Sequence, residues 1–250
     1  MLKRRVMPCL LLRGESLVKT IQFKKFSYIG DPINAVKIFN DCEVDELVIL
    51  DITATLEKRE PNFELIGKIV NECFVPLAYG GGVTTLDQMT RLFKLGIEKI
   101  CVNTALFENP EFIKSAVDRF GAQSVVASID CKKNIFGQYE TFTRSGTHKV
   151  KMKLDDVMIT IEKLGVGEVM INDISRDGMM EGYNLELIEQ FLKTLKTPLI
   201  AIGGAGTLEH LKEAFALGIK ALAAGSLFVY KSKLRGVLIN YPNKEIEKMR

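Results

Sequence analysis

The stretch PLAYGGGVTTL at residues 76–86 returns as PLIAIGGAGTL at residues 198–208, a displacement of 122 positions. The same displacement places three more segments of the first half on similar segments of the second: ELVILDI on EVMINDI, NFELI on NLELI and FKLGI on FALGI. The register holds without a gap from residue 46 to residue 97, which chance does not produce. The chain is therefore an internal duplication, with halves at about 1–122 and 123–250.

Both halves alternate short strands with helices. Runs of β-branched and other apolar residues predict eight strands, at residues 6–12, 47–52, 75–79, 100–103, 124–130, 169–172, 199–202 and 221–224. Apolar residues at three- and four-residue spacing predict the helices between them, at 32–42, 62–73, 86–95, 110–120, 154–164, 185–195 and 208–217. This α/β pattern predicts a single domain, 1–250, folded as a (β/α)8 TIM barrel; a doubly wound parallel sheet is the alternative. The duplication favours the barrel, because two four-unit halves close it with pseudo-twofold symmetry.

The composition excludes several classes of function. The formal net charge of +3 is spread without a Lys/Arg block, which argues against nucleic-acid binding. Apolar runs stay below the ~18 residues of a membrane span, and the first residues carry no small-residue cleavage site, so we expect a cytoplasmic protein. The five cysteines have no C-x-x-C spacing and the two histidines lie far apart. We therefore expect reduced thiols, no metal site and no cofactor.

Two long connections occupy corresponding positions, after the first strand at residues 13–31 and after the fifth at residues 132–153. Connections that follow barrel strands lie at the C-terminal face, where active sites are built. We expect these two to be lids over the site, with plain insertions as the alternative.

Glycine-rich turns follow the third and seventh strands, at residues 80–82 and 203–206. Each has a small polar partner after the next strand: Asn103 and Thr104 in the first half, Gly225 and Ser226 in the second. Glycine lets the backbone approach an oxyanion, the polar residue donates a hydrogen bond, and the following helix N-terminus supplies N–H groups. Two such phosphate cups predict a ligand phosphorylated at both ends. Asp177 and Gly178 are candidate contributors to the second cup, with an ordinary polar turn as the alternative.

Acidic residues end three of the predicted strands. Asp51 and Asp173 lie at equivalent places after the second and sixth strands, and Asp130 ends the fifth. Carboxylates at the C-terminal ends of barrel strands indicate catalytic or binding groups. The first strand is the repeat partner of the fifth, yet it has Leu11 where the fifth has Asp130. Two opposed carboxylates could run acid and base steps, whereas one alone runs a single proton transfer or orients a ligand.

Charged residues immediately precede four strands and should ring the N-terminal opening of the barrel. They are Arg5, Glu46, Lys99 and Glu168. Two positive and two negative charges could close this opening as a salt-bridged layer. A purely stabilising ion network at the non-catalytic face is the alternative.

From residue 1 to about residue 233 the sequence resembles the cyclase subunit of imidazole glycerol phosphate synthase, the HisF family of histidine biosynthesis. The segments that carry the resemblance are ELVILDITATLEKRE, YGGGV, KICVNTALFENP, FGAQSVVASIDCK, TRSGT, SRDGMMEGYN, IAIGGAG and HLKEAFALG. DITATLEKR separates this family from its sister isomerase, which shares the duplication. The resemblance implies a cytosolic lyase-type synthase subunit in a glutamine amidotransferase heterodimer. A glutaminase docks at the bottom of the barrel, and ammonia crosses the interior to a bisphosphorylated ribonucleotide at the mouth.

The resemblance also assigns residues. The family's phosphate cups fall on Gly82, Asn103 and Thr104, and on Asp177, Gly178, Gly204, Gly225 and Ser226, with Gly225 a change from the usual alanine. Its ammonia gate falls on Arg5, Glu46, Lys99 and Glu168, all retained. Its catalytic positions Asp130, Asp51 and Lys19 are retained too. The other catalytic carboxylate falls on Leu11 and is lost, and the segment around Asn172 and Asp173 departs from the family, which removes an acid at Ser175.

Leucine neither accepts nor donates a proton, and a positioned acid–base group typically contributes ~100- to 10,000-fold in rate. We therefore expect impaired histidine-pathway turnover unless Asp51, Asp173 or Glu15 substitutes. The pattern resembles divergent second copies of the subunit, found with a second glutaminase and a sugar amidotransferase in surface-polysaccharide or glycan biosynthesis. An active cyclase with a relocated base and a non-catalytic phosphate-binding scaffold that activates a glutaminase are the alternatives.

Overall fold

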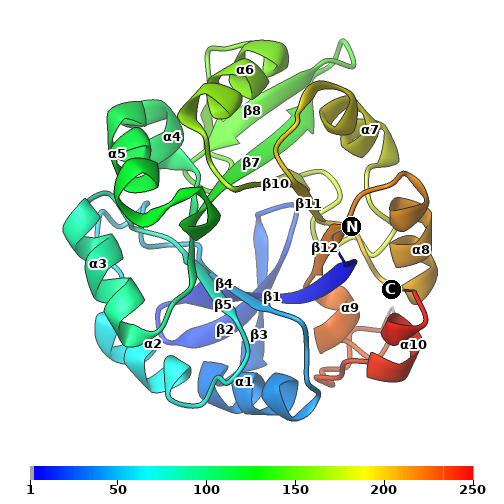
Figure 1. Ribbon diagram of the computed structural model, residues 1–250. Helices are drawn as coiled ribbons and strands as arrows, with labels where there is room; N and C mark the ends of the chain where they lie inside the picture. The colour runs from blue at the N-terminus through cyan, green and yellow to red at the C-terminus, as the bar shows by residue number, and fades with distance from the viewer. Residues whose placement is uncertain (1–2, 233, 250) are drawn as a thin grey trace.

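Eight parallel strands close into a barrel in the computed structural model, which describes residues 3–232 and 234–249 (Figure 1). Residues 1–2 and 250, the ends of the predicted domain, lie outside these ranges, as does residue 233. In order around the barrel the strands are β1 (Arg5–Arg13), β4 (Leu47–Asp51), β5 (Leu77–Gly80), β6 (Lys99–Val102), β7 (Val125–Lys133), β10 (Glu168–Asp173), β11 (Leu199–Ile202) and β12 (Ala221–Ala224). β12 pairs back onto β1, with Ala221 opposite Arg5. This pairing confirms the (β/α)8 barrel and rules out the open doubly wound sheet.

Helices surround the barrel (Figure 1). Those at the predicted places are α1 (Pro32–Asp41), α2 (Phe63–Val70), α3 (Leu86–Leu95), α5 (Pro110–Phe120), α6 (Leu154–Leu164), α7 (Leu185–Thr194) and α8 (Leu208–Ala216). Short elements without a helical repeat in the sequence complete the chain: α4 (Thr104–Glu108), the 3-10 turn η1 (Ala122–Ser124), α9 (Ser226–Val229) and α10 (Asn243–Glu247). Polar side chains start several helices; at α3, Thr85 and Gln88 form a reciprocal capping box.

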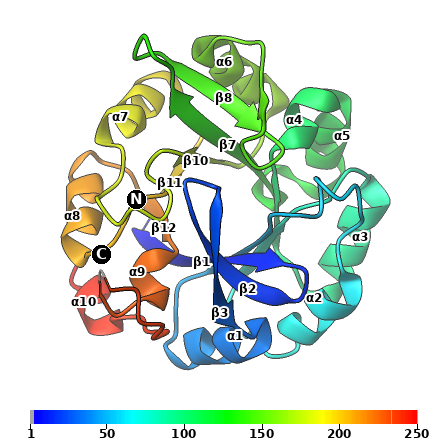
Figure 2. The same cartoon turned by 180° about the vertical axis from the view of Figure 1, so that it is seen from behind.

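The two long connections are antiparallel extensions of the sheet rather than irregular loops. β1 continues into β2 (Ser16–Ile21) and β3 (Lys25–Gly30), and β7 continues into β8 (Tyr139–Thr143) and β9 (His148–Lys149). The strands form because β1 and β7 run past the barrel rim and offer free backbone groups, as in the pairing of Leu11 with Val18. Figure 2 shows that β2 and β3, here called the lid hairpin, lie across the centre of the barrel.

Apolar side chains form an inner and an outer layer. Along β1, Met7, Cys9 and Leu11 belong to the inner cluster inside the barrel, whereas Val6 and Leu10 belong to the larger outer cluster. Alternation along a strand sends successive side chains to opposite faces, so both faces of each barrel strand are apolar. In the part of the chain that the structure describes, no helix has the length and apolar character of a membrane span.

Candidate functional site

A cavity of about 480 Å³ opens at the C-terminal ends of the barrel strands. Most residues predicted for catalysis or phosphate binding line it, and so does Leu11, whereas the predicted strand-end carboxylate Asp173 does not. These lining residues are Lys19, Asp51, Gly82, Asn103, Thr104, Asp130, Asp177, Gly178, Gly204, Gly225 and Ser226. The barrel topology brings them together, because the ends of all eight parallel strands meet at one face.

Asp130 is one of the buried carboxylates of this cavity, 9% exposed near the end of β7. Asn172 Nδ2, on neighbouring β10, donates to its Oδ1 at 3.4 Å, and Asn103 Nδ2 lies 3.4 Å from its Oδ2. Burial raises the pKa of Asp130 to about 7, while the Asn172 hydrogen bond lowers the pKa and the negative charge of Asp177 raises it. A carboxyl group with this pKa can accept or donate a proton near neutral pH.

Asn172 contributes an unpaired acceptor beside Asp130. Its side chain is 8% exposed, and its Oδ1 has no hydrogen-bond partner among the residues that the structure describes. A side chain on Gly203, at the end of β11, would overlap with this oxygen. An amide oxygen left unpaired in a cavity is costly unless a ligand or water donates to it. Asn172 therefore keeps a buried, unpaired oxygen beside Asp130.

Leu11 makes the opposite side of the mouth apolar. It is 8% exposed and packs in the inner cluster with Val18 of the lid hairpin. Of the three candidate replacements for a lost carboxylate, Glu15 is exposed and Asp173 accepts hydrogen bonds from Ser175 N at 2.8 Å and Asn184 Nδ2 at 2.6 Å. Only the third, Asp51, is a cavity-lining residue.

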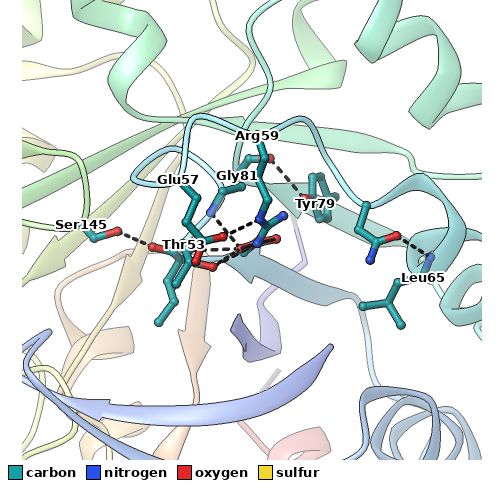
Figure 3. Close-up of polar contacts among 11 residues, drawn as sticks. Thr53, Glu57, Arg59, Leu65, Tyr79, Gly81 and Ser145 are labelled. Carbon is teal, nitrogen blue, oxygen red and sulfur yellow. Dashed lines mark hydrogen bonds and ion pairs between the residues drawn. The ribbon is translucent and has the colours of Figure 1, made fainter. Parts of the chain in front are cut away.

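Asp51 is held in an ion pair at the end of β4. Its side chain is 2% exposed and lies 2.8 Å from the guanidinium of Arg59. It also accepts hydrogen bonds at 3.1 Å from the backbone N–H groups of Thr53 and Ala54. Figure 3 shows Arg59 reaching back over this turn, between Thr53 and Glu57. The carboxylate thus fixes the connection at residues 52–61, which contributes Thr53, among others, to the cavity.

The lid hairpin is fastened to the connection after β10. Thr20 Oγ1 donates to the carboxylate of Asp177, and Gln22 N donates to the Asp177 carbonyl at 2.9 Å. The Gln22 side chain donates to the Ser175 carbonyl at 2.9 Å. The Asp177 carboxylate, predicted as part of the second phosphate cup, therefore binds the lid.

The two predicted phosphate cups differ in one respect from the expectation that helix N-termini supply their N–H groups. The helices that begin inside the cups, α4 and α9, have 5 and 4 residues, so their dipoles are weak. At α3 and α8, Thr85 and Thr207 accept hydrogen bonds from Gln88 N and His210 N. The cups are backbone turns: Gly82 has a φ of +73°, and a side chain there would come within 2.7 Å of the Arg59 carbonyl.

At the other end of the barrel, the four predicted gate residues form a ring of ion pairs. Lys99 Nζ lies 2.9 Å from Glu46 and 2.8 Å from Glu168. Arg5 pairs with Glu46 at 2.7 Å and also with Glu168. Each cation bridges both carboxylates, so the charges alternate around the opening. The inner apolar cluster lies between this ring and the cavity at the mouth.

Sequence reasoning missed several contacts that shape the site. It did not anticipate that Arg59 pairs with Asp51, that Thr20 binds Asp177, or that Ser145 Oγ donates to the Ile52 carbonyl at 2.7 Å. Each contact has at least one partner in a connection without helical or strand period, so no local pattern signals it. Ser145 does lie within TRSGT, one of the segments that carry the family resemblance.

Comparison with known proteins gives a consistent result. Residues 5–235 match the model of the family described as "Histidine biosynthesis protein". A candidate imidazole glycerol phosphate synthase subunit hisF2 of Pseudomonas aeruginosa is 46% identical over 97% of both chains. A candidate HisF subunit of the same synthase from Leptospira borgpetersenii is 48% identical over 97% of this chain and 96% of that one. The HisF subunit of Exiguobacterium sp. is 37% identical over 95% of this chain and 92% of its own.

Proposed function

We propose a function for this chain from its membership of the HisF family, the cyclase subunits of imidazole glycerol phosphate synthase. The chain is an ammonia-accepting, lyase-type subunit, and its own cyclase step is weakened. Its ligand is a bisphosphorylated ribonucleotide or a compound of that shape, bound between the two phosphate cups. Asp130 moves one proton at this ligand, and Lys19 supplies a positive charge beside it.

The observation that carries this proposal is the composition of the mouth. All the phosphate-cup residues line one cavity with Asp130, but Leu11 stands where a second proton-transfer group is needed. Asp51 is tied to Arg59, and Asp173 is tied to Asn184. The mouth therefore retains binding and one acid–base group and lacks the opposing one.

The ion-pair ring supports a glutaminase partner at the bottom of the barrel. Three of its side chains are partly exposed, Arg5 at 28%, Lys99 at 17% and Glu168 at 12%, so a docked protein can reach them, whereas Glu46 is buried behind them at 5%. Above the ring the inner cluster is apolar, and neutral ammonia crosses such a region at much lower cost than ammonium does. We propose that the ring is the gate for ammonia and that the protein works in a heterodimer.

The final acceptor of the ammonia is proposed to be a sugar bound to a separate amidotransferase, in surface-polysaccharide or glycan biosynthesis. One observation supports a second-copy role, the apolar Leu11 at the position where the family has its other catalytic carboxylate.

One observation favours a second candidate, an active histidine-pathway cyclase. Asp130 has a pKa of about 7 and a free acceptor beside it in Asn172, so one residue could serve acid and base steps in turn.

The decisive experiment reconstitutes the chain with the glutaminase encoded nearest to it and supplies glutamine and the bisphosphorylated ribonucleotide of the histidine pathway. We expect stimulated glutamine hydrolysis, with cyclised product formed at least ~100-fold more slowly than by family members that have both carboxylates. Leu11→Asp should raise cyclisation, whereas the matched variant Leu11→Asn, which cannot transfer a proton, should not. Family-like cyclisation by the parent chain would establish the second candidate. Stimulated hydrolysis with no amination of any acceptor would favour the scaffold.

A further inference from the structure

Gly225, between β12 and α9, has no conformational need to be glycine. Its φ of −107° and ψ of −66° lie in the right-handed helical region, which every L-residue adopts. This sets it apart from Gly82 and Gly204 of the phosphate cups, whose φ angles are +73° and +100°. The reason for a glycine at residue 225 must lie in the space around it.

That space is filled by the ammonium of Lys19. A β-carbon built on Gly225 overlaps with Lys19 Nζ and comes within 3.0 Å of Lys19 Cε and of the Cys9 carbonyl oxygen. The position of a side chain at residue 225 is thus the place where the lysine head group sits. Lys19 arrives from β2 of the lid hairpin, which Thr20 and Gln22 fasten to Asp177.

The Lys19 residue is largely buried, and its ammonium has no anionic partner among the described residues. Lys19 is 6% exposed, and within the described ranges no carboxylate pairs with it inside 4 Å. Burying a charge without a partner is unfavourable, so the site gains most from a ligand that carries negative charge. Lys19, Gly225 and Ser226 all line the cavity at the mouth. An anionic group of a ligand in the cavity can therefore reach the ammonium.

We infer that Gly225 is a positioning residue for Lys19. Because residue 225 has no side chain, it leaves a space, here called the seat, that the Lys19 ammonium occupies beside the cavity. In this position, with the lid hairpin closed, the ammonium can bind an anionic group. That the anionic group is a ligand phosphate rests on the proposed function. The seating itself follows from the packing of Gly225 and Lys19.

The test is a double-mutant cycle read by phosphate binding. Gly225→Ala should still fold, because the closest atom it displaces is the free end of a flexible side chain and the Cys9 carbonyl, at 3.0 Å, needs only a small shift. Isothermal titration with inorganic phosphate should show binding about tenfold weaker in Gly225→Ala than in the parent, since one charge-assisted contact is lost. In the Lys19→Met background, where the seat is empty, Gly225→Ala should change phosphate affinity less than about twofold.

Two matched variants control for charge and for glycine replacement. Lys25→Met removes a positive charge from an exposed position of the same hairpin, and Gly67→Ala adds a methyl group whose nearest neighbour is 3.6 Å away. Neither should alter phosphate affinity more than about twofold. Amide hydrogen exchange over residues 16–30 gives a second readout, which should accelerate in Gly225→Ala and not in the controls.

Equal loss of affinity in both Lys19 backgrounds, or unchanged affinity and exchange in Gly225→Ala, would overturn the inference. So would a parent protein that shows no saturable phosphate binding. If the proposed amidotransferase role fails, the double-mutant cycle still tests this inference, because phosphate binding requires neither a glutaminase nor an ammonia acceptor.

Discussion

Replacing Arg59 with methionine removes the partner of a buried carboxylate and keeps most of the side-chain volume. Asp51 is 2% exposed, and breaking a buried pair by deleting one partner typically costs 3–5 kcal/mol. Two features reduce this cost: Asp51 keeps the backbone N–H groups of Thr53 and Ala54, and Arg59 is itself 29% exposed. We expect Arg59→Met to lower the free energy of unfolding by about 2–3 kcal/mol.

Thermal and urea unfolding measure this effect. For a chain of this length, about 2–3 kcal/mol corresponds to a fall in Tm of roughly 4–12 °C. Glu57→Gln is the matched control: Glu57 pairs with the same guanidinium but is 55% exposed, so its loss should cost much less than the loss of Arg59.

A double-mutant cycle with Asp51→Asn isolates the pair. In that background Arg59→Met should cost less than half as much, because no buried negative charge is left unpaired. A cost below about 0.5 kcal/mol in the parent, or an equal cost in both backgrounds, would show that the Asp51–Arg59 pair does not stabilise the turn.

Three further outcomes are expected. Lys99→Met opens the ion-pair ring and leaves Glu46 and Glu168 with Arg5 alone, so glutamine hydrolysis should become uncoupled from amination. The ratio of glutamate to aminated product measures this uncoupling. Lys114→Met, at an exposed position, is the control. The pKa of Asp130, about 7, lies above its ordinary 3.8, so the native state holds this proton between those pH values. Stability relative to Asp130→Asn should therefore fall by on the order of 4 kcal/mol as the pH rises from about 4 to 7, and urea unfolding across that range checks the sign. Asn172→Leu removes the hydrogen bond that lowers the Asp130 pKa and should raise it by about 0.5–1, as followed by carbon-13 NMR of the carboxyl group; an unchanged titration would mean that the amide does not tune it.

The barrel could be predicted from the sequence because apolar residues and whole segments recur in it at regular intervals. The duplication fixed the number of strand–helix units, and the spacing of apolar residues located the seven long helices. The lid hairpin could not be predicted in this way. β2 and β3 form by pairing with the part of β1 that passes the rim, which is a tertiary condition. Short helices such as α9 have too few residues to show a period.

The membership of the site could be predicted, whereas its internal contacts could not. Almost every predicted mouth residue lines the cavity, because topology alone brings strand ends together; Asp173, which is bonded to Ser175 and Asn184 instead, is the exception. The ion pair between Asp51 and Arg59 spans a connection without regular structure, and the overlap of Lys19 with the missing side chain of Gly225 joins distant segments. Contacts of this kind depend on side-chain packing in three dimensions, which a single sequence does not encode locally.

The pairing of β1 with β12 has a consequence for how the protein folds. Each of the other barrel strands pairs with the strand before it in the barrel order, but this seam joins Arg5 to Ala221, nearly the whole chain apart. Closing so long a loop costs entropy that only the finished contacts repay, so each half can collapse first and the seam should close last. Lys19 and Gly225 lie on opposite sides of the seam. An anion that binds both the Lys19 ammonium and the backbone at Gly225 would therefore link the two ends of the chain, and we expect it to slow their separation on unfolding.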